Sequence, residues 1–336
     1  MTSQATATPS TWTTEAARQY CQRLARSHYE NFTVGSWLVP KDKLRHIYAV
    51  YAYCRTVDDL GDEAALEGSD PSSLEVDTVS LLAARLEGST GGFGGDDRAY
   101  RLALLDLWQA ELEACYSGTP SHPVMVALRE SIDAFDLPAE PLLKLIEANR
   151  MDQRSQRYPI YDDLLHYCDH SANPVGRLFL YLFGYRDEER QKMADATCTA
   201  LQLANFWQDV ARDYRKGRIY LPLEDMARFG YTEEELAQGV VTPEFSQLLA
   251  FEVERAMDLF RQGAPLASTL DGVARLDVAL FTRGGVAVLE AIRKQRYDVL
   301  TARPSLSRAR KAGLFLSTWL GWRLGLGFRL PTMPRD

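Results

Sequence analysis

Residues 194–222 read ADATCTALQLANFWQDVARDYRKGRIYLP, and this stretch decides both the expected fold class and the expected chemistry. Asn205, Asp209 and Asp213 are four residues apart, so they line one face of a helix with 3.6 residues per turn. The same stripe is apolar one turn earlier, at Leu201, and therefore turns acidic within a single helix. An ordinary solvated face is the alternative, although such a face normally interleaves carboxylates with Lys or Arg.

A second stretch, LRHIYAVYAYCRTVDDLGD at residues 44–62, shows the same change from apolar to acidic. Its inward stripe runs through Tyr51 and Arg55 to Asp58 and Asp62. Like charges one turn apart repel, and in a partly dry cavity they would take up protons unless a cation held them ionised. Oxygen donors without a His or Cys cluster favour Mg²⁺ or Mn²⁺ over zinc, and Mg²⁺ commonly bridges to substrate phosphate. Two such helices facing one pocket would hold a diphosphate through magnesium.

These stretches resemble the two aspartate-rich motifs of the squalene and phytoene synthases. The likeness is carried by DDLGD at 58–62, by NFWQDVARD at 205–213 and by the KGRIYLP that follows, and it covers about residues 27–311. The segments HYENFTVG, TALQLANFWQDV and SANPVGRL are most similar to the bacterial hydroxysqualene synthases of squalene and hopanoid formation. The resemblance implies an all-α, single-domain isoprenoid-synthase bundle around a central cavity.

The resemblance also implies roles for single residues. It assigns metal binding, with roughly two or three Mg²⁺ ions as the cofactor, to Asp58, Asp62, Asn205, Asp209 and Asp213. It assigns catalysis to Tyr51, Arg55, Tyr167, Asp58 and Asp209. It assigns substrate binding to Ser27, His28, Phe32, Gln202, Lys216, Arg218 and Tyr220.

Other roles remain open for several of these residues. Arg55 could pair with an aspartate as ordinary structure or bind diphosphate oxygens, and the resemblance favours the second role. His28 departs from the family's commonest pattern and reads equally well as a surface or core histidine. Lys216 and Arg218 could form a mobile basic flap over the diphosphate or could only oppose a helix dipole. Gln208 stands where many relatives have Arg. This difference argues against a step that needs a cation at that position, including the condensation of two farnesyl diphosphates.

The implied reaction is the ionisation of presqualene diphosphate and capture of the carbocation by water, which gives hydroxysqualene. No GxGxxG follows a strand pattern, so no NADPH is expected. The pathway partners would be a presqualene diphosphate synthase and a hydroxysqualene-processing oxidoreductase. One alternative is head-to-head condensation of farnesyl or geranylgeranyl diphosphate to squalene, dehydrosqualene or phytoene. The other is a helical assembly protein without activity.

The composition limits the class of protein and the cellular compartment that we expect. The 336 residues are 46% hydrophobic and 25% charged with a net charge of -8, which is ordinary for a globular protein and argues against a nucleic-acid surface. Five dispersed cysteines suit a reducing interior, and no signal peptide is recognisable, so we expect a cytoplasmic protein that could contact the inner face of the membrane. Residues 1–15 read as a frayed tail, 16–311 as the synthase domain, and 312–336 as an apolar segment. Arg323 interrupts the run at 314–330, which is short for a membrane span and predicts a helix that rests on the bilayer or closes the pocket.

The remaining periodicity predicts about a dozen helices and no strands. Besides those that carry the two motifs, helices are expected at 16–31, 74–86, 100–116, 123–135, 139–149, 161–183, 242–263 and 273–303. Asn173, Pro174 and Gly176 should bend the helix at 161–183. Gly61 lies inside the first motif, where its missing side chain would let a metal or phosphate approach the backbone or would mark fraying.

Overall fold

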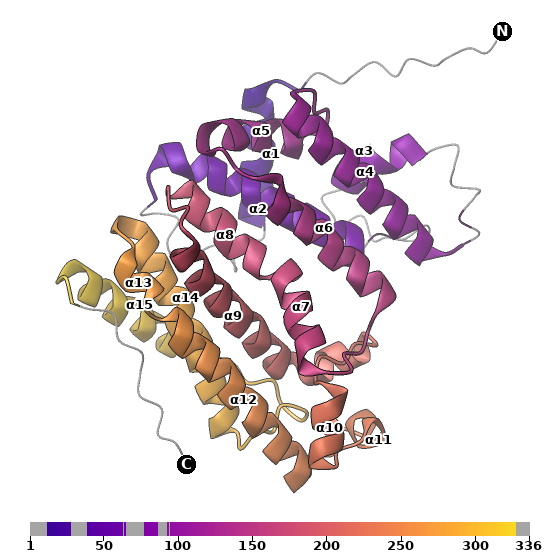
Figure 1. Cartoon of the computed structure of the whole chain (residues 1–336), viewed down its shortest axis with the longest axis vertical. Coiled ribbons are helices and arrows are strands. Elements are labelled where there is room, and N and C mark those ends of the chain that lie inside the picture. The colour runs from indigo at the N-terminus through magenta and orange to yellow at the C-terminus, as the bar shows by residue number, and fades with distance from the viewer. Residues whose placement is uncertain are drawn as a thin grey trace. The chain divides into compact units, whose positions relative to one another are not determined.

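The computed structural model describes residues 12–27, 39–62, 64, 77–86, 93 and 95–326. This part of the chain is all-α (Figure 1), as predicted. The described residues pair as β-structure only in one isolated parallel bridge between Arg157 and Ile219. No helix among the described residues is both long enough and apolar enough to cross a membrane.

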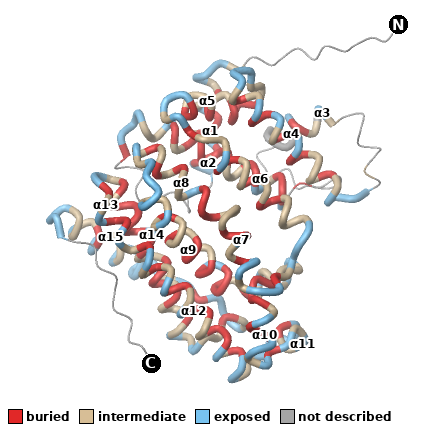
Figure 2. The backbone as a smooth tube through the Cα atoms, in the orientation of Figure 1, coloured by how far each residue is buried: buried red, intermediate tan, exposed pale blue. Residues whose placement is uncertain are grey.

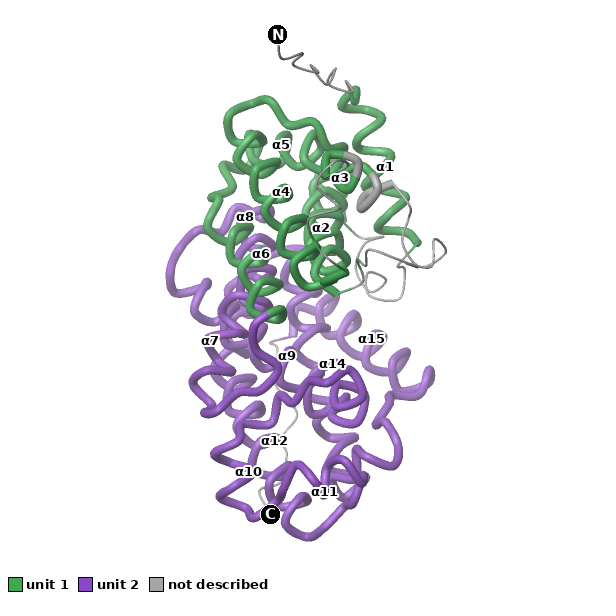
Figure 3. The backbone as a smooth tube through the Cα atoms, turned by 90° about the vertical axis from the view of Figure 1, so that its right-hand side faces the viewer, with its two compact units in different colours: residues 1–33, 39–153 green, residues 34–38, 154–336 purple. Residues whose placement is uncertain are grey.

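The chain divides into two compact units (Figure 3). Unit 1 comprises residues 1–33 and 39–153, and unit 2 comprises residues 34–38 and 154–336. The predicted single domain over 16–311 spans both units and stays a prediction.

Unit 1 carries the first acidic motif on its second helix. Its helices are α1 (Thr14–Ser27), α2 (Lys41–Asp62), α3 (Asp77–Leu86), α4 (Asp97–Ser117), α5 (Pro123–Phe135) and α6 (Ala139–Arg154), whose last residue crosses into unit 2. The rings of Tyr53 and Trp108 stack in its core, with centroids 5.6 Å apart. The Tyr53 hydroxyl donates to the Leu142 carbonyl oxygen at 2.8 Å, which ties α2 to α6.

Unit 2 is built around one long helix that carries the second acidic motif. Its helices are α7 (Tyr161–Ser171), α8 (Asn173–Leu182), α9 (Glu188–Arg215), α10 (Leu223–Phe229), α11 (Glu233–Ala237), α12 (Pro243–Gly263), α13 (Leu266–Thr269), α14 (Gly272–Lys294) and α15 (Arg308–Arg323). Helix α9 packs against α7, α8, α12 and α14, and its buried residues run along most of its length (Figure 2). A helix surrounded in this way is held firmly, so it is a rigid support for the residues at its carboxyl end.

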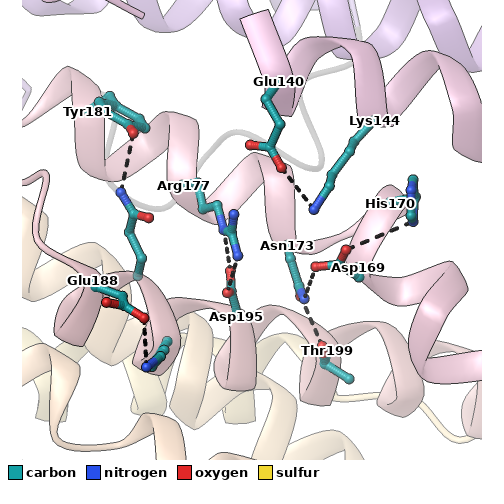
Figure 4. Close-up of polar contacts among 12 residues, drawn as sticks. Glu140, Lys144, Asp169, His170, Asn173, Arg177, Tyr181, Glu188, Asp195 and Thr199 are labelled. Atoms are coloured by element: carbon teal, nitrogen blue, oxygen red, sulfur yellow. Dashed lines mark hydrogen bonds and ion pairs between the residues drawn. The ribbon is translucent and has the colours of Figure 1, made fainter. Parts of the chain in front are cut away.

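Polar pairs fix α8 on α9 (Figure 4). Arg177 binds Asp195 through two hydrogen bonds of 3.0 and 2.7 Å, and the Thr199 hydroxyl donates to the Asn173 side-chain oxygen at 2.9 Å. Gly176 allows the close approach, because a Cβ there would lie 2.5 Å from the Cys198 sulfur.

Several helix boundaries differ from those predicted. The helix expected at 161–183 is not bent but broken at Ala172, and Pro174 lies in the first turn of α8, where its missing N–H is not needed. The helix expected at 273–303 ends at Lys294, because Arg296 and Tyr297 adopt positive φ angles of 53° and 64°. The helix at 139–149 continues to Arg154. Of the predicted helix at 16–31, residues 28–31 lie outside the described part.

Candidate active site

The first acidic motif lies at the carboxyl end of α2. Arg55 forms an ion pair of 2.5 Å with Asp59, which is the structural role that the sequence left open for it. Asp58 and Asp62 are exposed one turn apart, and Asp62 is among the groups that raise the pKa of Asp58. Tyr51 is half-buried on the same helix, and burial raises its pKa.

Asp58 is accessible to water, yet desolvation by the surrounding protein raises its pKa to about 7. The Asn149 side-chain amide donates to Asp58 at 3.4 Å and opposes this rise in pKa. A carboxyl group in this state lacks a full counter-ion.

Helix α6 approaches the motif at Gly61. A Cβ on residue 61 would lie 2.1 Å from the Asn149 side-chain oxygen, and the Gln153 amide donates to the Gly61 carbonyl oxygen at 2.8 Å. The group that approaches this glycine is therefore the Asn149 side chain. Asn149 was not identified as a site residue from the sequence. The one feature of the sequence that could have indicated it is the spacing of two amides, Asn149 and Gln153, four residues apart at the end of a helix.

The second acidic motif lies along the last turns of α9, as the spacing predicted. Asn205 is exposed, and Asp209 and Asp213 are partly buried. Burial, and then the negative charge of Asp209, raise the pKa of Asp213 to about 7, while Arg218 and Lys216 oppose the rise. The basic turn thus acts electrostatically on the last carboxyl of the motif.

Asp209 already has a cationic partner in this structure. The Arg303 guanidinium contacts both Asp209 carboxylate oxygens, at 2.6 and 2.7 Å, and raises its own pKa by doing so. It also donates to the Gln208 side-chain oxygen at 2.9 Å, while the buried Gln208 amide donates to the Pro304 carbonyl oxygen. Gln208 therefore positions a cation from elsewhere in the chain. From the sequence Arg303 was expected to end a helix, although proline disfavours helical geometry in the residue that precedes it.

An aromatic cluster lies next to this motif. Phe206 and Tyr220 stack with centroids 3.7 Å apart, and Tyr167 lies 6.0 Å from Tyr220 and 6.2 Å from Phe206. Tyr158 stacks on Tyr220 with ring centroids 5.6 Å apart, and it was not predicted as a site residue from the sequence. Phe206 and Tyr220 also line a small pocket; its other lining residues are Val210, Asp213, Arg218, Ile219, Leu221 and Leu236.

The basic turn after α9 is fastened to residues 156–158. Gly217 has a φ of 80°, its carbonyl oxygen accepts from Arg157 at 2.6 Å, and the Ile219 amide donates to the Gln156 carbonyl oxygen at 2.9 Å. Lys216 is exposed on this turn, and Arg218 is partly buried in the pocket wall. These bonds anchor both ends of the turn, and its closing over substrate stays a prediction.

The other predicted site residues have no described contact that indicates their role. Ser27 is the exposed last residue of α1, and its hydroxyl donates to the Leu24 carbonyl oxygen at 2.9 Å. Gln202 is partly buried on α9. His28 and Phe32 lie outside the described residues. The structure thus groups Tyr51, Arg55, Asp58 and Asp62 in unit 1, and it groups Tyr167, Asp209, Asp213, Lys216, Arg218 and Tyr220 in unit 2.

The carboxylate and amide donors of the two motifs fit Mg²⁺ better than they fit a metal whose ligands all come from the protein. Among the described residues no group of three or more His, Cys, Asp or Glu side chains is gathered to hold a metal ion. Mg²⁺ does not require such a group, because it usually keeps several waters and takes one or two carboxylates together with substrate phosphate oxygens. Each motif has one carboxyl, Asp58 or Asp213, whose pKa is raised to about 7, mainly by desolvation, and a cation bound beside it would oppose that rise.

The chain is similar in structure and in sequence to several known proteins. The squalene synthase HpnC from Alicyclobacillus acidocaldarius has a similar structure, with a TM-score of 0.73 and 41% identity over 84% of this chain and 95% of that one. A dehydrosqualene synthase shares the fold with a TM-score of 0.74 and 24% identity over 93% of this chain and 98% of that one. The 15-cis-phytoene synthase of Synechococcus elongatus is 28% identical over 307 residues, which cover 88% of this chain and 90% of the relative.

The family model for squalene/phytoene synthase matches residues 25–310, which is most of the chain and includes both acidic motifs. The resemblance carried by those motifs is therefore confirmed over residues 25–310. This chain belongs to the squalene/phytoene synthase family.

Proposed function

We propose that this enzyme ionises presqualene diphosphate and adds water to the resulting carbocation, forming hydroxysqualene for squalene and hopanoid synthesis. The observation that supports the ionisation step is the arrangement at the end of α9, where one small pocket is lined by the Asp213 carboxyl, by Arg218 of the basic turn and by the rings of Phe206 and Tyr220. The choice of a squalene precursor is supported by the 41% identity to a squalene synthase, which exceeds the 28% identity to a phytoene synthase.

Charged and polar residues of the proposed site would bind the diphosphate and its metal ions, and aromatic residues would surround the hydrocarbon part. Asp58, Asp62, Asn205, Asp209 and Asp213 would hold Mg²⁺. When bound, Mg²⁺ neutralises the diphosphate and improves it as a leaving group. Lys216 and Arg218 would add charge-assisted hydrogen bonds to the diphosphate oxygens. The carbon–oxygen bond breaks with its electron pair going to the diphosphate, water attacks the carbocation, and the oxonium formed loses a proton.

The aromatic cluster is suited to the cationic stage. The ring faces of Phe206, Tyr167 and Tyr220 carry negative charge density that attracts a cation without forming a bond to it. All three side chains are buried, so they also limit the water that could capture the cation too early. Tyr167 and Tyr220 would therefore bind the reacting carbons, while Lys216 and Arg218 bind the headgroup.

A second function shares the same first step. Head-to-head condensation of farnesyl or geranylgeranyl diphosphate also begins with ionisation, and the phytoene synthases of Synechococcus elongatus and Arthrospira platensis are 28% and 29% identical to this chain. The Arg303 guanidinium beside Gln208 favours this alternative, because it supplies a cation next to Asp209.

Purified protein should be incubated with Mg²⁺ and with presqualene, farnesyl or geranylgeranyl diphosphate in separate reactions. We expect hydroxysqualene from presqualene diphosphate alone, carrying one ¹⁸O atom when the reaction runs in H₂¹⁸O, as shown by mass spectrometry. A C30 or C40 hydrocarbon formed only from farnesyl or geranylgeranyl diphosphate would overturn the proposal in favour of the second function. A reaction with EDTA in place of Mg²⁺ is the control for non-enzymatic hydrolysis.

A further inference from the structure

Helix α15 packs on α14 with one face, and the other described residues leave an apolar face of α15 uncovered. On the covered face, the buried Thr318 hydroxyl accepts from Arg283 of α14 at 3.0 Å, and the Trp322 indole donates to the Gly272 carbonyl oxygen at 2.9 Å. These bonds fix which face of α15 points away from α14. Large apolar side chains that gather on an exposed face commonly mark a site of interaction with a partner or a membrane.

The open face carries a row of exposed leucines. Leu316 and Leu320 are one turn apart and 53% and 44% exposed. Leu324 and Leu326 continue the row just beyond the helix and are 71% and 59% exposed. These four residues, the outer leucine row, account for nearly half of the large exposed hydrophobic side chains among the described residues.

The stretch of chain that leads into and contains this row is strongly basic, in contrast to the chain as a whole. Residues 291–326 contain eight Lys or Arg and one acid, Asp298, whereas the whole chain has a net charge of -8. The exposed Arg308, Arg310 and Lys311 form the first turn of α15, where positive charge opposes the helix dipole. Of these three, only Arg310 forms an ion pair with a described residue, at 2.8 Å with Glu290. Helix stability therefore does not explain this cluster.

Three occupants could cover the outer leucine row, and the charge decides among them. A second copy packed face to face would bring two basic segments together, and like charges opposed across an interface are unfavourable. A membrane-spanning role fails on length, because the 16 residues of α15 span about 24 Å against a hydrocarbon core of about 30 Å. An anionic bilayer surface satisfies both features, since leucines enter the boundary of the acyl region while Lys and Arg contact lipid phosphates.

We propose that α15 and the basic residues around it form a docking site for the surface of an anionic phospholipid membrane. The inference does not depend on which isoprenoid the enzyme makes. It would place the protein where amphiphilic prenyl diphosphates and hydrocarbon products partition.

The test is sedimentation of the full chain with vesicles of phosphatidylcholine alone or mixed with phosphatidylglycerol, at low and high salt. We expect binding to the mixed vesicles, weakened by salt, and little binding to phosphatidylcholine. The variant Leu316→Asp/Leu320→Asp should lose binding, because it places two carboxylates at the boundary of the acyl region. Its matched control is Ile160→Asp/Val240→Asp, which alters side chains that are 42% and 40% exposed elsewhere in unit 2 and should bind as the wild type does.

The charge contribution is tested separately. Arg308→Gln/Lys311→Gln should weaken binding to the mixed vesicles by about 25-fold, since each basic residue near an anionic surface contributes roughly fivefold. Lys192→Gln, which alters an exposed lysine on α9, is the control and should change little. Circular dichroism checks that each variant is folded. Equal binding to both vesicle types, or binding unaffected by the leucine variant, would overturn the proposal. So would a wild-type dimer in gel filtration that the leucine variant converts to a monomer, because the row would then bind a second copy.

Discussion

Replacing Gly61 by alanine tests whether α6 sets the geometry of the first acidic motif. The added Cβ would lie 2.1 Å from the Asn149 side-chain oxygen, 2.8 Å from its Cγ and 3.0 Å from its Cβ. The Asn149 amide can rotate away, but it then loses its bonds to the Leu145 carbonyl oxygen at 3.1 Å and to Asp58 at 3.4 Å. The Cβ contact remains, because rotation cannot move that atom.

The expected magnitude is a balance of two opposing effects. Alanine is favoured over glycine within a helix by about 1 kcal/mol. Two lost hydrogen bonds at about 1 kcal/mol each, with a residual tight contact, outweigh that gain. We therefore expect Gly61→Ala to lower the free energy of unfolding by about 1 kcal/mol.

Gly284→Ala provides the matched control. Gly284 lies inside α14, and a Cβ there would meet no atom within 4 Å. This variant should gain up to about 1 kcal/mol, so the two variants should differ by about 2 kcal/mol.

Denaturant unfolding of both variants measures the difference, and turnover reports the site. Gly61→Ala should also lose turnover, because Asp58 loses the amide that holds it, whereas Gly284→Ala should keep wild-type turnover. If Gly61→Ala were as stable as Gly284→Ala and fully active, Asn149 would not occupy the space beside Gly61, and the account of this motif would be wrong.

Three further results are expected. Asp58→Ala and Asp209→Ala should each abolish turnover and keep a native circular dichroism spectrum, and chelation of the wild type should stop a reaction that added Mg²⁺ restores; wild-type turnover in either variant would refute the metal assignment. Glu252 is fully buried, which raises its pKa to about 8. The folded protein then keeps a proton that the unfolded chain has already lost, so stability should fall as the pH rises from about 4.5 to 8. Glu252→Gln should flatten that fall in pH-dependent unfolding, and an unchanged slope would assign the fall to other groups. Arg303→Gln should tighten Mg²⁺ binding measured by calorimetry, because a competing guanidinium leaves Asp209; unchanged affinity would show that the pair does not form in solution.

The local sequence pattern was sufficient to predict a helix where nearby residues set its ends and its buried face. The helix at 123–135 has the bounds predicted, since Pro123 starts it and Asp136 ends it with a positive φ of 49°. The stripe of Asn205, Asp209 and Asp213 depends only on helical spacing, and it lies on α9 as expected. Both acidic motifs, and with them the family, could thus be identified from the sequence.

Contacts between distant segments could not be predicted in this way. Arg303 reaches Asp209 across 94 positions of the chain, and Asn149 reaches Asp58 across 91. No periodicity relates such positions, because each contact depends on where a helix ends and which neighbour it packs against. The end of α14 at Lys294 is one such event, since it releases the segment that brings Arg303 back to α9.

The sequence by itself therefore determined the all-α class, the two acidic motifs and the apolar character of residues 314–330, because each depends on residues within a few turns of one another. The tertiary structure alone decided which groups neutralise the carboxylates, how Tyr158 and Tyr220 join Tyr167, and which side of α15 remains open. These features depend on the packing of whole helices, whose relative positions follow from many weak contacts spread along the chain.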